Sequence, residues 1–161
     1  MKDVLTAPKT RAVFMFLLAL SFGVLLFGGY LINRDKPPIP SAVRSPQGEA
    51  IFSRDDVVNG QNFYFSRGGQ HIGTIWGHGS YLAPDWSADF LHRMGLYLAA
   101  RQHGLSPDHA ATFTQKDFDA FDEVTQATLK AQVKKELKQN RYDPAKDELT
   151  FTPNQKEAFE V

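Results

Sequence analysis

Cysteine is absent from the 161 residues of this chain. Its absence excludes disulfides, thiolate metal sites, iron–sulfur clusters and the Cys-x-x-Cys-His attachment of a c-type haem. An excess of charge of either sign is also missing, because 18 basic residues balance 18 acidic residues. A nucleic-acid partner is therefore not expected, since proteins that bind phosphate backbones carry a basic surface.

One long apolar run lies near the N-terminus. It extends from Ala12 to Ile32 without a charged residue. At about 1.5 Å per residue it is long enough to cross a hydrocarbon core of about 30 Å, and this predicts a transmembrane helix. A cleaved signal peptide is the alternative, but its apolar region normally spans only about 7–15 residues and ends in small residues.

Basic residues flank this run on both sides: Lys2, Lys9 and Arg11 before it, and Arg34 and Lys36 after it. The small excess on the N-terminal side predicts a cytoplasmic N-terminus and a single pass through the membrane. The sequence then divides into a tail (1–11), a transmembrane helix (12–32), a linker (33–52) that contains an extended proline-rich spacer, and a domain on the far side of the membrane (53–161).

Helical patterns dominate the predicted domain. Helices are expected from Ser53 or Asp55 to about Phe65, from Asp85 to Gly104, as a short turn at Ser106-Pro107, and from Thr114 to about Gln139. The second helix carries an apolar stripe predicted to be buried: Trp86, Phe90, Leu91, Met94, Tyr97 and Leu98. The third has its own predicted buried side: Phe118, Phe121, Val124, Leu129, Val133 and Leu137. The fold class is therefore mainly α.

A short strand is expected over residues 148–152, and Thr152-Pro153-Asn154-Gln155 then has the pattern of a helix start. Only a few residues follow, so the chain stops inside an element that it has just begun. We therefore expect residue 161 not to be a natural domain end. The chain is then either a fragment or one half of a split protein.

The segment from Gly68 to Pro84 is rich in glycine but also contains large apolar residues, which favours a structured loop over a flexible linker. Its second half and the start of the next helix supply the candidate interface residues Trp76, Gly77, His78, Pro84 and Asp85. Three interpretations remain open: oxygen ligands for a hard cation, a surface for a partner, or a packed loop before a capped helix. Histidine spacings match no zinc motif, and no self-sufficient active site is evident.

The same segment resembles the N-terminal region of the quinol-dependent nitric oxide reductases, single-chain bacterial enzymes that reduce two NO to N2O. The matching residues are Gly60-Gln61, Tyr64, Gly68-Gly69-Gln70, Gly73 to Gly79, Tyr81, Ala83 to Asp89 and Leu91-His92-Arg93. In that family the region is similar to a small cytochrome c subunit without its haem. In register, the two attaching cysteines fall on Gly69 and Ile72, and the histidine falls on Gly73.

The resemblance implies a role as anchor and periplasmic domain in the bacterial inner membrane, capping a multi-helix catalytic part that this chain does not contain. That part holds the haems b and the non-haem iron, and it receives electrons from membrane quinol. This chain alone is expected to bind no haem and to be inactive. The resemblance also implies that the Gly79 carbonyl and the Tyr81 side chain help to ligate a calcium shared with a haem propionate.

A different class of function stays open beside this one. The chain is then an independent membrane-anchored module that binds another protein through the loop between Gly68 and Asp85 and has no redox role. A neighbouring reading frame rich in membrane helices and histidines favours the reductase interpretation.

Overall fold

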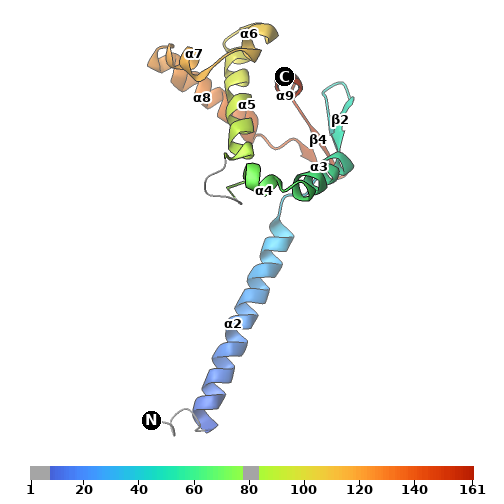
Figure 1. Cartoon of the computed structure of the whole chain (residues 1–161), viewed down its shortest axis with the longest axis vertical. Coiled ribbons are helices and arrows are strands. Elements are labelled where there is room, and N and C mark those ends of the chain that lie inside the picture. The colour runs from blue at the N-terminus through green and yellow to red at the C-terminus, as the bar shows by residue number, and fades with distance from the viewer. Residues whose placement is uncertain (1–7, 78–83) are drawn as a thin grey trace. The chain divides into compact units, whose positions relative to one another are not determined.

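The computed structural model describes residues 8–77 and 84–161. The chain divides into two compact units, Met1–Ile39 and Pro40–Val161. Helices account for most of the described residues, and one small sheet accompanies them (Figure 1). The predicted fold class, mainly α with one N-terminal apolar helix and a small helical domain, is confirmed.

The described part of the first unit is dominated by one helix, α2 (Pro8–Asp35), of 28 residues. It contains the whole predicted apolar run, and its most apolar window has a mean hydropathy of 2.3. By length and composition α2 can cross a membrane. None of its residues is buried within its own unit.

The second unit contains a four-stranded sheet in the order β2-β1-β4-β3. Its strands are β1 (Ala42–Arg44), β2 (Ala50–Ser53), β3 (Tyr142–Asp143) and β4 (Glu148–Thr150). β1 pairs antiparallel with β2 and parallel with β4, which places Val43 beside Leu149. The predicted linker thus contains two strands of the folded unit. Sequence reasoning missed them because the partner β4 lies near the other end of the chain, and no local pattern signals such a pairing.

The remaining elements are α3 (Arg54–Ser66), α4 (Gly69–Ile72), α5 (Trp86–Gln102), α6 (Pro107–Ala111), α7 (Gln115–Asp119), α8 (Glu123–Lys138) and α9 (Pro153–Glu160). Five predicted helix starts are confirmed by side chains that accept hydrogen bonds from the first turn: Ser53, Asp85, Ser106, Thr114 and Thr152.

The prediction of a single helix from Thr114 to Gln139 is wrong, because the structure has two helices there, α7 and α8, separated by a short non-helical segment. The physical reason is a second N-cap. The Asp122 carboxylate accepts hydrogen bonds from the backbone N–H groups of Val124 at 3.1 Å and Thr125 at 3.0 Å. An aspartate that bonds the backbone in this way favours a helix start over a helix interior.

The core lies around α5, which contacts α6, α8 and α9 (Figure 1). Leu98 and Ala100 are completely buried in it. Two clusters of buried residues share this helix, one built on Tyr97, Ala100 and Ala110 and the other on Ala99, Phe118 and Leu129. The predicted stripes are therefore only partly correct. Five of their members are exposed: Trp86, Phe90, Leu91, Val124 and Leu137.

Candidate functional site

The candidate site consists of the two segments that border residues 78–83. Thr74 and Asp85 form a parallel β-bridge between them. The Thr74 N–H donates to the Pro84 carbonyl at 2.7 Å, and the Trp86 N–H donates to the Thr74 carbonyl at 2.9 Å. These bonds hold the two ends of the loop together. The predicted structured loop therefore has fixed ends, which agrees with its apolar content.

The Asp85 carboxylate joins this loop to helix α5. One oxygen accepts from the Ala88 N–H at 3.0 Å and caps the helix. The other accepts from the Thr74 hydroxyl at 3.0 Å and, in a short contact, from the Gly77 N–H. The hydrogen bond from Ala88 is the main reason why the pKa of Asp85 lies below its ordinary value, and the bonds from Gly77 and Thr74 act in the same direction.

Two glycines before the loop allow aromatic rings to pack against the backbone. A Cβ atom on Gly73 would lie 1.8 Å from the Trp86 indole nitrogen, and one on Gly69 would lie 2.2 Å from the Tyr64 ring. The Tyr64 hydroxyl also donates to the Gly73 carbonyl at 2.6 Å. Any larger residue at either position must displace a ring.

These two glycines occupy positions at which the resemblance would place haem-attaching residues, with Ile72 between them. The segment offers neither thiol nor imidazole at those positions, and the Tyr64 and Trp86 rings fill the space that a side chain would need. A covalently attached haem therefore does not fit this segment as it is folded. The glycine pattern was visible in the sequence, but the two rings that require it were not.

Trp76 and Gly77 turn the chain where the loop leaves α4. Both have positive φ, 54° and 70°, and a positive φ is uncommon for a residue as large as tryptophan. The Trp76 N–H donates to the Ser87 hydroxyl at 3.1 Å, while 71% of the residue is exposed. The fold thus holds a large apolar side chain at the surface in a conformation that costs energy.

Six large apolar residues in the segments before and after residues 78–83 are exposed. We call them the loop-flanking surface: Ile72, Ile75, Trp76, Trp86, Phe90 and Leu91. Helix α3, which packs next to α4, adds more exposed apolar residues and buries none: Val57, Val58, Phe63 and Phe65. Soluble domains seldom expose so many large apolar side chains without a partner to cover them. The sequence analysis assigned Trp86, Phe90 and Leu91 to the core. Their helical spacing is the same whether they pack inside this chain or against a partner.

The structure brings four of the predicted interface residues together: Trp76, Gly77, Pro84 and Asp85. His78 and the predicted calcium ligands Gly79 and Tyr81 lie outside the described residues. Within residues 8–77 and 84–161, no group of three or more histidine, aspartate or glutamate side chains is placed to hold a metal ion.

Comparison with protein families gives a match to the NorB cytochrome c-like domain of nitric oxide reductase, over residues 40–161. The start of this match agrees with the start of the second unit at Pro40, so the family domain includes the sheet strands β1 and β2. A comparison with curated proteins found no match. Because the family match covers most of the chain, the protein belongs to the family of NorB cytochrome c-like domains of nitric oxide reductase.

Proposed function

We propose that this chain is the membrane anchor and periplasmic domain of a quinol-dependent nitric oxide reductase. Its domain caps the haem-bearing catalytic part and docks on it through the loop-flanking surface. The observation that carries the proposal is the exposure of large apolar side chains around a loop whose ends are fixed by hydrogen bonds. A fixed surface loses little conformational freedom on docking, which favours tight association.

The chain itself carries out no redox step in this proposal. Electrons pass from membrane quinol to the haems b and the non-haem iron of the catalytic part, where two NO become N2O. The rings of Tyr64 and Trp86 support a haem-free domain, because they occupy the places of haem-attaching side chains. The domain then contributes a shape and a surface rather than an electron carrier.

Calcium at the loop belongs to the same proposal. Both Asp85 oxygens accept hydrogen bonds, one from Thr74 and Gly77 and the other from Ala88 in α5. The carboxylate therefore fixes the position of the loop end relative to α5. The resemblance to the nitric oxide reductases supports the Gly79 carbonyl and the Tyr81 phenol as the oxygen ligands that the loop supplies, with the calcium shared with a haem propionate of the catalytic part. Calcium commonly takes about 6–8 oxygens, so it can link groups from two such parts.

Docking is tested by co-purification of the tagged full chain with the catalytic part. Trp76→Ala removes a large exposed side chain from the loop-flanking surface, and we expect at least about 30-fold weaker association, as for an interface residue worth about 2 kcal/mol. Val124→Ala is the matched control, because Val124 is equally exposed but lies on α8, away from that surface. Equal association of wild type and Trp76→Ala would contradict the proposed surface.

Membrane orientation is tested separately. Alkaline phosphatase fused after Val161 is expected to be active in a bacterial host, because the proposed topology places the domain in the periplasm. An inactive phosphatase together with an active cytoplasmic reporter at the same site would reverse the topology.

A further inference from the structure

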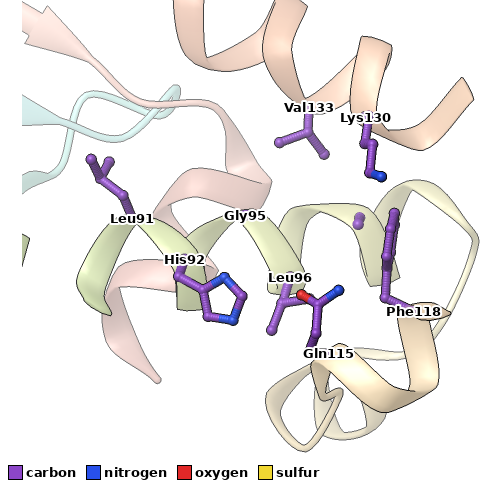
Figure 2. Close-up of a pocket in the computed structure, with 9 residues that line it drawn as sticks. Leu91, His92, Gly95, Leu96, Gln115, Phe118, Lys130 and Val133 are labelled. Carbon is purple, nitrogen blue, oxygen red and sulfur yellow. The ribbon is translucent and has the colours of Figure 1, made fainter. Parts of the chain in front are cut away.

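A pocket of about 280 Å³ opens between α5, α7 and α8, apart from the loop-flanking surface except at Leu91. Figure 2 shows Lys130 and Val133 projecting from α8 toward α5, with the ring of Phe118 beside them. The lining residues are Leu91, His92, Gly95, Leu96, Ala99, Gln115, Phe118, Lys130 and Val133. Most of them are apolar, and none is acidic.

Gly95 makes room in this pocket. It lies in the middle of α5, where glycine is less stable than alanine by about 0.5–1 kcal/mol. A Cβ atom on Gly95 would meet nothing within 4 Å, so packing within the described chain does not require a glycine here. The helix therefore accepts a less stable residue and leaves the pocket open.

Lys130 gives the pocket its charge. Its ammonium lies 5.4 Å from the centre of the Phe118 ring, so the ring attracts it toward the apolar wall. None of the ion pairs among the residues that the structure describes involves Lys130. A cation beside an apolar hollow that has no acidic residue in its lining attracts an anion that also has an apolar body.

We propose that this pocket binds a small carboxylate with an apolar chain, such as a short fatty acid. The chain lies along Leu96, Ala99 and Val133, and the carboxylate accepts hydrogen bonds from the Lys130 ammonium. If each non-hydrogen group takes roughly 30 Å³, as water does in the liquid, the pocket holds on the order of ten such groups. Octanoate has this size. The proposal does not depend on docking to the reductase.

Octanoate binding is measured with the full chain in lipid nanodiscs, by NMR of methyl groups in labelled alanine and valine. We expect saturable shifts of the Ala99 and Val133 signals. 1-Octanol, which has the same chain without the charge, should bind about tenfold more weakly, because a hydrogen bond to a charged group contributes roughly that factor. Lys130→Gln should reduce octanoate binding to the level of octanol.

Two further variants locate the site. Gly95→Leu fills the pocket from a position with free space and should abolish binding of both compounds. Lys138→Gln removes an exposed lysine of the same helix outside the pocket, and octanoate should bind to it as to wild type. Equal affinity for octanoate and octanol, unchanged octanoate binding to Lys130→Gln, or no saturable shift in wild type would each overturn the proposal.

Discussion

Gly73→Ala is the sharpest test of how the candidate site is packed. Gly73 has extended backbone, with φ −164° and ψ 163°, which alanine adopts without strain. The substitution therefore isolates one effect, the overlap of the new methyl group with the Trp86 indole at 1.8 Å. Forcing an extra methyl group into a packed site costs about 1–3 kcal/mol. The loss of unfolded-state entropy recovers about 0.4–1 kcal/mol.

The midpoints of these two ranges give an expected net loss of about 1.3 kcal/mol in the free energy of unfolding of the second unit. At about 4 °C per kcal/mol for a domain of this size, Tm should fall by about 5 °C. Tryptophan fluorescence during thermal or urea unfolding of the full chain is the suitable measurement. The chain has 2 tryptophans, and Trp76 and Trp86 both lie at this site, so the signal reports on the packing that the substitution disturbs.

Gly60→Ala is the matched control. Gly60 lies inside α3, and a Cβ atom there would meet nothing within 4 Å. Alanine should therefore stabilise the helix by about 0.5–1 kcal/mol. Opposite signs for the two substitutions support the close packing of Trp86 on Gly73. If Gly73→Ala is as stable as wild type, the indole moves aside without loss and the packing argument is refuted.

Three further outcomes are expected. Leu98→Ala should lower the free energy of unfolding by about 2–5 kcal/mol, as measured by urea unfolding, because Leu98 is completely buried. A loss below about 1 kcal/mol would contradict the placement of Leu98 in the core. The pKa of Asp85 is lowered in the folded state, so the ionised carboxylate stabilises the fold above about pH 4, and this stabilisation disappears as the pH falls through the folded-state pKa. Asp85→Asn should therefore flatten the dependence of the free energy of unfolding on pH in this range, and the same pH dependence for wild type and variant would contradict the prediction. Tyr81→Phe in the complete enzyme should reduce NO turnover or bound calcium far more than domain stability, whereas equal activity and calcium would exclude Tyr81 as a ligand.

Helix starts were predictable because they depend on about four consecutive residues. Ser53, Thr114 and Thr152 each form a capping box with the residue three positions later. The same local logic applies to Asp122, yet the sequence analysis predicted one continuous helix through this residue. The N-cap of α7 at Thr114 and the N-cap of α8 at Asp122 lie close together in the sequence. Apolar residues at helical spacing across residues 118–129 made the two helices resemble one, so the second N-cap was not recognised.

The sheet was not predictable in this way. β1 and β2 are short, and β1 pairs with β4, which follows all the helices of the core in the chain except α9. Arg44 and Glu148 also form an ion pair across this pairing at 2.7 Å. Such contacts form between residues far apart in the sequence, and neither partner carries a pattern that identifies the other. A proline-rich stretch before β1 made the linker prediction extend too far.

The site was predictable in its position but not in its packing. Glycines together with large apolar residues in one short segment indicated a structured loop, and the hydrogen bonds of Asp85 at its end agree with that. Helical spacing cannot separate a residue that packs inside one chain from a residue that packs on a partner, because both need an apolar face. Phe90 and Leu91 illustrate this limit, since each is more than 40% exposed on a face whose next turn enters the core at Met94.

The docking proposal explains two features together: the loop ends fixed by hydrogen bonds and the exposed apolar residues of the loop-flanking surface. Exposed apolar residues make an isolated domain prone to association, and Trp76 in addition has an unfavourable φ of 54°. Exposed apolar area adds little to the stability of the folded unit, and a positive φ at a tryptophan lowers it. Both become favourable if a partner covers the surface, because burial of apolar area then stabilises the complex and the loop ends are already ordered. Trp76→Gly separates the two effects. It should relieve the backbone by about 1–2 kcal/mol, and the greater entropy of the unfolded chain should offset about 0.4–1 kcal/mol of this, so the isolated chain should be at least as stable as wild type while association with the catalytic part weakens. A variant that loses stability in the isolated chain would show that Trp76 serves the fold rather than the interface.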